Sequence, residues 1–210
     1  MSRSNDRASR EWALAWTPVK IGWLSGVSRP RTNVLSADQL ALVQSLPGAA
    51  DWKLRTNFPY GLHPSTKPEF RRTPLLLASA VNLGRFAAAS QPLPRRSTRA
   101  AWRALRASCE RLLLVTNSCG SQIVASLEGR DPSSAPLHLF SLGPVDWGCA
   151  RLDQVRVRGS LDRIRTPRRS SSDVIVDGVG HMDYARSTEV RALAIQWVRS
   201  TLERAEVPVP

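Results

Sequence analysis

The chain has 210 residues, of which 42% are hydrophobic and 22% charged, and its formal net charge at pH 7 is +13. This composition excludes disorder over most of the length, because it supplies enough apolar surface to offset the entropy that the chain loses on folding. Residues 1–11 are predicted to be a disordered polar N-terminus, and residues 12–210 fit a single domain.

The apolar pattern predicts strands and helices in alternation. An apolar stretch up to Ile21 predicts a first strand, with a turn at Gly22 and Trp23. Ser36 is the predicted N-cap of a helix that ends at Pro47. The remaining predicted elements, in chain order, are a strand over 51–58, a loop over 59–74, helices over 75–90 and 97–108, a strand over 112–115, a helix from about 121, strands over 136–143, 153–160 and 172–178, and a helix over 188–203.

Strands that alternate with helices predict an α/β fold, with a mostly parallel sheet of about six strands and helices on both faces. In such sheets the reactive groups gather outside the carboxyl ends of the strands. Candidate functional residues are therefore expected just after each strand.

The positive charge is carried almost wholly by arginine, which at first suggests a nucleic-acid partner. However, the arginines are scattered through the chain, and no arginine-rich helix face with interleaved aromatic residues is visible. A solvated basic surface is therefore favoured over nucleic-acid binding. No run approaches the roughly 18 apolar residues of a membrane span, and no secretory leader is visible, so a cytoplasmic location is expected, with peripheral membrane contact left open.

The three cysteines, Cys109, Cys119 and Cys149, are far apart and odd in number, which does not indicate a disulfide framework. The paired CxxC or HxxxH spacings of local zinc sites are absent from the sequence. No metal and no cofactor is expected.

Residues 112–127, "LLLVTNSCGSQIVASL", form a strand-like run that becomes helix-like at a serine and a cysteine. A sharp strand-to-helix turn exposes a nucleophile and directs backbone N–H groups at the developing oxyanion. The turn needs small residues two positions before and after the nucleophile. Ser118 has Gly120 after it but Thr116 before it. Centring the turn on Cys119 instead gives a poorer steric match, so Ser118 is preferred.

An acid and a base follow on later strand ends. Asp162 lies in the loop after the strand over 153–160, and His181 follows the strand over 172–178. The order Ser, Asp, His is that of the α/β-hydrolase triad. Asp146 and Asp183 are the competitors for the acid, and Asp162 is preferred by its loop position. The other histidines, His63 and His138, are interpreted as structural.

With these residues, the chain resembles the α/β-hydrolase family, in particular its small lipase-like and esterase-like members. The segments that carry the resemblance are "LLLVTNSCGSQIV", "LHLFSLGPVDWG", "VRGSLDRI" and "DGVGHMDY". The resemblance implies Ser118 as nucleophile, Asp162 as acid and His181 as base, with backbone N–H groups of Cys119 and Trp23 in the oxyanion hole. It also implies a minimal fold without a large cap.

The implied activity is that of a serine hydrolase that cleaves carboxylic esters through an acyl-enzyme, with a small-molecule or lipid ester as substrate. Thr116 and Ile21 depart from the family pattern, which has glycine before the nucleophile and a His-Gly pair near the oxyanion hole. The alternative is therefore a catalytically degenerate α/β-hydrolase-like protein that binds anionic partners through its basic surface. Acyl transfer and the oligomeric state are left open.

Overall fold

The computed structural model describes residues 14–26, 33–58, 96–129, 135–145, 152–164 and 173–207. The predicted disordered N-terminus over 1–11, the loop over 59–74 and the helix over 75–90 lie outside these ranges, as do His63, Asp146 and Cys149. The division of the chain into domains therefore stays a prediction.

The predicted α/β fold and the number of strands are confirmed. Six parallel strands form one sheet in the order β2-β1-β3-β4-β5-β6. The strands are β1 (Thr17–Ser25), β2 (Lys53–Asn57), β3 (Cys109–Asn117), β4 (Leu137–Leu142), β5 (Gln154–Gly159) and β6 (Val174–Val176). The helices are α2 (Ala37–Ser45), α4 (Arg96–Ala107), α5 (Gly120–Glu128) and α6 (Thr188–Glu203), and a short 3₁₀ helix, η1 (Ala50–Trp52), precedes β2.

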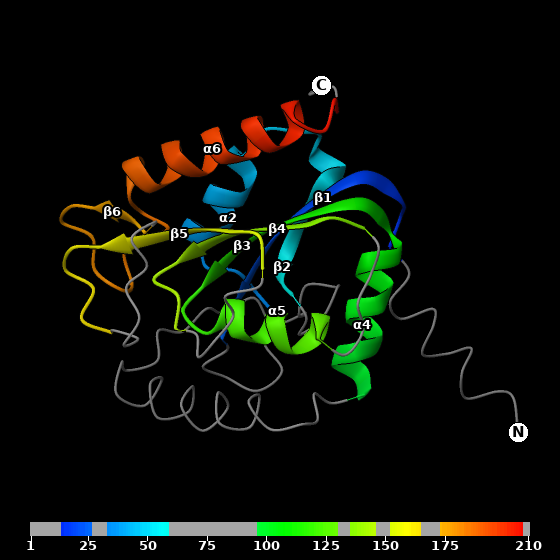
Figure 1. Ribbon diagram of the computed structural model, residues 1–210, viewed down its shortest axis with the longest axis horizontal. Coiled ribbons are helices and arrows are strands. Elements are labelled where there is room, and N and C mark those ends of the chain that lie inside the picture. The colour runs from blue at the N-terminus through cyan, green and yellow to red at the C-terminus, as the bar shows by residue number, and fades with distance from the viewer. Residues whose placement is uncertain are drawn as a thin grey trace, which may run out of the picture.

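The sheet is covered on both faces, by α2 and α6 on one side and by α4 and α5 on the other (Figure 1). Because side chains alternate across a strand, β3 contributes to both layers. Leu113 and Val115 join the cluster under α2 and α6, while Leu112 and Leu114 join the cluster under α4 and α5. All four side chains are fully buried, so β3 lies at the centre of the molecule.

Two helices follow directly from local sequence signals. The Ser36 hydroxyl accepts the Gln39 N–H, and the Gln39 side chain accepts the Ser36 N–H, so that the predicted N-cap forms a complete capping box. The C-terminal helix has the predicted bounds, and its buried stripe, which includes Trp197 and Val198, packs on the sheet. Both predictions are confirmed. They could be made from sequence because each depends on residues within a few positions of one another.

The predicted end of the first strand is wrong. β1 does not turn at Gly22 and Trp23 but continues to Ser25. A Cβ on Gly22 would lie 2.9 Å from Leu54 Cδ1, so this glycine allows side chains of the neighbouring strands to pack closely. Trp23 is fully buried in the strand interior, opposite Val115 of β3.

Two ion pairs that share one buried carboxylate join the last two strands of the sheet. Asp173, which precedes β6, accepts Arg156 Nε at 2.9 Å and Arg158 Nε at 2.6 Å. Its side chain is 2% exposed, so the carboxylate depends on these two cations for compensation. The pairing fixes β6 beside β5 and thereby the loops that follow the two strands.

Four strand ends meet at one edge of the sheet. Asn117 of β3 pairs with Leu142 of β4, Leu142 pairs with Val157 of β5, and Gly159 pairs with Val176 of β6. All the strands are parallel, so the loops after β3, β4, β5 and β6 leave the sheet on the same side. No helix within the described ranges is long and apolar enough to cross a membrane.

Candidate active site

Ser118 occupies a sharp turn between β3 and α5. Its φ angle is +56°, in the left-handed region that a residue with a Cβ seldom adopts. Its N–H donates to Leu142 O at 3.0 Å, and its carbonyl accepts Val145 N–H at 2.9 Å. These two bonds, one to the last residue of β4 and one to the loop after it, hold the backbone in the costly conformation, which is a common feature of functional turns.

Gly120, the small residue after the turn, lies so close to the end of β1 that a side chain does not fit there. A Cβ on Gly120 would lie 2.3 Å from Leu24 O, which is backbone and cannot rotate away. Thr116, the bulkier residue before the turn, lies in the interior with its hydroxyl bonded. It is buried, and its hydroxyl donates to Ser141 Oγ at 3.0 Å, which in turn donates to Gln154 Oε1.

Gly120→Ala is expected to destabilise the protein by about 1–3 kcal/mol, because the added methyl group overlaps a fixed carbonyl. Chemical denaturation at equilibrium measures the change. Gly129→Ala at the other end of α5 is the matched control, since its backbone is right-handed helical and a Cβ there would be 3.2 Å from Ala125 O. Equal stability of the two variants would contradict the close approach at Gly120.

The acid and the base predicted from sequence lie together. His181 Nδ1 is 2.9 Å from Asp162 Oδ2. The side chains are 12% and 4% exposed, respectively, so the pair is largely shielded from water. Asp162 Oδ1 accepts the Ile164 N–H at 2.9 Å, and Oδ2 also accepts the Tyr184 hydroxyl at 2.6 Å. Three donors therefore converge on one carboxylate.

These donors set the ionisation of Asp162. Burial raises the pKa of the carboxyl, but hydrogen bonds from His181, Tyr184 and the Ile164 N–H outweigh it, so the pKa is lowered overall. Burial also raises the pKa of the Tyr184 hydroxyl, and its bond to Asp162 raises it further. The arrangement consequently holds an ionised carboxylate beside a protonated phenol at neutral pH.

Gly143, immediately after β4, makes room for this cluster. Its φ angle is +47°. A Cβ there would lie 2.5 Å from Asp162 Oδ2 and 2.7 Å from the Tyr184 ring. Gly143 directly follows Leu142, which bonds to the Ser118 N–H, so one short segment contacts both the serine turn and the acid.

Within the described residues, the Ser118 hydroxyl and the His181 ring are not hydrogen-bonded to each other. His181 Nε2 has no hydrogen-bond partner among those residues, whereas Nδ1 is held by Asp162. A general base needs this free nitrogen, and an Nδ1–H donated to the carboxylate leaves Nε2 as an acceptor. The structure thus joins His181 to Asp162 and brings the Ser118 turn to the same edge of the sheet.

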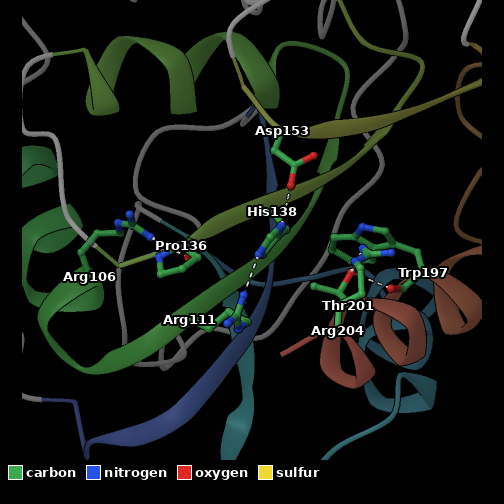
Figure 2. Close-up of polar contacts among 8 residues, drawn as sticks. All are labelled: Arg106, Arg111, Pro136, His138, Asp153, Trp197, Thr201 and Arg204. Carbon is green, nitrogen blue, oxygen red and sulfur yellow. Dashed lines mark hydrogen bonds and ion pairs between the residues drawn. The ribbon is translucent and has the colours of Figure 1, made fainter. Parts of the chain in front are cut away.

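A second His–Asp pair, drawn in Figure 2, lies at the starts of β4 and β5 and therefore at the opposite edge of the sheet. His138 Nδ1 is 2.6 Å from Asp153 Oδ2, and Arg111 Nη1 is 3.0 Å from His138 Nε2. All three residues lie near the amino ends of strands. Arginine can only donate, so His138 Nε2 is occupied as an acceptor and is not available to a reacting group.

The Cys119 thiol is a poor alternative nucleophile. Burial raises the pKa of the thiol. Hydrogen bonds from the backbone N–H groups of Cys119 and Gly26 lower it, but by less, so the pKa is raised overall. The thiol is therefore protonated at neutral pH, and a protonated thiol reacts slowly. Cys119 is the N-cap residue of α5, so its own N–H lies at the start of that helix.

The resemblance implies an oxyanion-hole role for the Trp23 N–H in a turn after the first strand, but Trp23 lies inside β1, where its carbonyl accepts the Phe58 N–H. The chain leaves the strand at Gly26. Asn57 of β2 fixes this exit, because its side chain accepts the Ser25 N–H at 3.0 Å and donates to the Ser25 carbonyl at 3.4 Å. Gly26 is therefore the first residue after β1, whereas Trp23 lies within the strand.

Three large apolar side chains near the pair are exposed. Leu161 and Ile164 flank Asp162 and are 63% and 39% exposed, and Met182 follows His181 and is 66% exposed. Asp183, the competing acid, is also exposed and is not the partner of His181. Sequence reasoning missed Tyr184 altogether, and no local pattern marks it, since its contact with Asp162 depends on the tertiary fold.

Comparison with solved structures agrees with this architecture. The chain is similar to the crystal structure of a protein of unknown function from Agrobacterium tumefaciens that has been assigned provisionally to the alpha/beta hydrolases, at 15% identity and a TM-score of 0.51. The match covers 94% of this chain and 92% of that protein. No protein-family model and no curated protein matches the chain. The fold is thus an α/β fold with an all-parallel sheet of six strands that resembles the alpha/beta hydrolases.

Proposed function

We propose that the protein is a serine hydrolase that cleaves carboxylic esters, with Ser118 as nucleophile, His181 as base and Asp162 as acid. The observation that carries the proposal is the His181–Asp162 contact of 2.9 Å at the edge of the sheet that also carries the strained Ser118 turn. The other His–Asp pair lies at the wrong edge and has its second nitrogen occupied.

The chemistry follows from these positions. His181 Nε2 accepts the Ser118 proton as the hydroxyl attacks the ester carbonyl, and Asp162 stabilises the imidazolium that forms. The N–H of Cys119 at the start of α5, together with that of Gly26 in place of Trp23, receives the oxyanion. Each such donor lowers the barrier by about 3–4 kcal/mol. The leaving alcohol takes the proton from His181, and water then releases the acyl group.

The exposed apolar side chains favour an ester with an apolar acyl portion. Leu161, Ile164 and Met182 expose apolar surface beside the acid and the base. Burial of such surface against a hydrocarbon chain is favourable by about 25 cal/mol per Å². Hydrolysis of p-nitrophenyl esters with longer chains is accordingly expected to show a lower KM than that of the acetate.

Labelling with a fluorophosphonate probe tests the proposal directly. The folded protein is expected to react, and peptide mass spectrometry is expected to locate the adduct on Ser118, because only an activated serine attacks this phosphorus. Acid-unfolded protein is the control and is expected to stay unlabelled. A folded protein that does not react, or an adduct on another residue, would contradict the assignment. In that case the alternative function, binding of anionic partners through the basic surface, is favoured, and such binding is expected to weaken as the salt concentration rises.

A further inference from the structure

Tyr184 is the second side chain bonded to the candidate acid. It follows His181 by three positions in the turn that precedes α6. Its hydroxyl is 2.6 Å from Asp162 Oδ2, the oxygen that also accepts His181 Nδ1. On its other side, the phenolic oxygen is 2.9 Å from the Gly159 N–H at the end of β5.

The direction of this chain is fixed by elementary donor and acceptor rules. A backbone N–H can only donate, so the Tyr184 oxygen accepts from Gly159. The single phenolic proton then goes to Asp162 Oδ2. The order Gly159 N–H to Tyr184 O–H to Asp162 therefore holds whatever the tautomer of the histidine.

The tyrosine is held rigidly. It is 1% exposed, and its ring meets the His181 ring edge to face, with centroids 6.3 Å apart and planes at 80°. Gly143 lies against the ring and the carboxylate, where a Cβ would be 2.8 Å from the hydroxyl. A hydroxyl fixed by a strand end, a ring contact and a glycine cannot follow the carboxylate if the carboxylate turns.

We propose that Tyr184 is a positioning residue of the candidate active site. Its hydroxyl fixes the Asp162 carboxylate, and the fixed carboxylate in turn directs His181 toward Ser118. This inference rests on the proposed function and deepens it. By sharing Oδ2 with the histidine, the phenol also withdraws negative charge from the oxygen that faces the imidazole. The geometry of the acid and its strength as a proton acceptor thus both depend on one hydroxyl.

Tyr184→Phe is the test, because it keeps the ring against His181 and removes only the hydroxyl. Loss of the donor is expected to lower kcat for a p-nitrophenyl ester by roughly tenfold with KM unchanged, since the base is less well oriented. It is also expected to move the acidic limb of kcat/KM upward by about half to one pH unit. Without the phenol, the carboxylate keeps more negative charge on Oδ2 and stabilises the protonated imidazole more strongly. Thr201→Val, which removes a buried hydroxyl bonded to Trp197 O in α6, is the control and is expected to move neither.

A second measurement does not depend on activity. In protein with ¹³C-labelled aspartate carboxyls, the pKa of Asp162 is expected to rise in Tyr184→Phe and to stay unchanged in Thr201→Val. Among the described residues, Arg158 acts on Tyr184 electrostatically but is already paired with Asp173, and His181 Nδ1 is already bonded to the same carboxylate, so neither replaces the lost donor. This outcome supports the role of Tyr184 even if the protein has no esterase activity, in which case the proposed function alone fails.

Incorporation of 3-fluorotyrosine gives the opposite change in a protein that keeps every side chain. The more acidic phenol is a stronger donor, so the Asp162 pKa and the acidic limb are expected to move downward. The proposal is overturned if Tyr184→Phe folds and leaves the Asp162 titration unmoved, or, should that variant not fold, if fluorination leaves it unmoved.

Discussion

Ser118→Ala is expected to lower kcat for ester hydrolysis by about 10⁵- to 10⁶-fold, the order seen when the nucleophile of an intact triad is removed. The variant loses the attacking oxygen, and the remaining N–H donors cannot form an acyl-enzyme without it. Alanine tolerates the left-handed φ of +56° about as badly as serine does, so the backbone strain and the fold are expected to be unchanged. Steady-state hydrolysis of p-nitrophenyl esters, with far-ultraviolet circular dichroism to check the fold, measures the effect.

Ser121→Ala is the matched control for this loss. Ser121 lies in the first turn of α5, is fully buried, and its hydroxyl has no hydrogen-bond partner within the described residues. Removal of an unsatisfied buried hydroxyl is expected to leave kcat unchanged and the stability equal or slightly higher. A Ser118→Ala variant that keeps a tenth or more of the activity would show that another residue attacks the ester.

The fold could be predicted from sequence where its signals are local. The Ser36 capping box and the buried stripe of α6 involve residues a few positions apart, and both elements formed as expected. The end of β1 could not be predicted, because Gly22 has the sequence signature of a turn. Its actual role, close packing against Leu54 of a neighbouring strand, becomes visible only in three dimensions.

The same distinction applies to the candidate site. A parallel sheet places all its carboxyl ends at one edge, so residues after β3, β5 and β6 could be grouped by strand order alone. That reasoning brought Asp162 and His181 to one edge, and the structure joins them. It could not find Tyr184 or Gly143, because neither carries a sequence signal of its role. Tyr184 acts by a hydrogen bond to the carboxylate, and Gly143 acts by leaving room for it, and both contacts exist only in the folded chain.

Asp162→Asn is expected to lower kcat by about 10⁴-fold while the protein stays folded. Both carboxylate oxygens accept a donor, Oδ1 the Ile164 N–H and Oδ2 the Tyr184 hydroxyl. The backbone N–H is fixed whereas the hydroxyl hydrogen can rotate, so the amide oxygen of the variant takes the Oδ1 position. The amide NH₂ then faces His181 Nδ1 and donates to it. The imidazole proton moves to Nε2, and the ring can no longer accept the Ser118 proton. Kinetics together with ¹⁵N NMR of the histidine tautomer measure both effects.

Stability and pH provide a separate check of the same variant. The pKa of Asp162 is lowered in the folded protein, so its carboxylate stabilises the fold fully above the pKa of the unfolded chain, about 4. That contribution is lost as the pH falls through the lower folded value. The difference in unfolding free energy between wild type and Asp162→Asn is therefore expected to narrow below about pH 4.

Asp183→Asn is the matched control, because this neighbour of His181 is exposed and does not bond to the ring. It is expected to keep kcat and the histidine tautomer of the wild type. If Asp183→Asn were the inactive variant and Asp162→Asn the active one, the carboxylate that supports the base would be the exposed one. The buried cluster of Asp162, Tyr184 and Gly143 would then hold the loops together without a role in proton transfer.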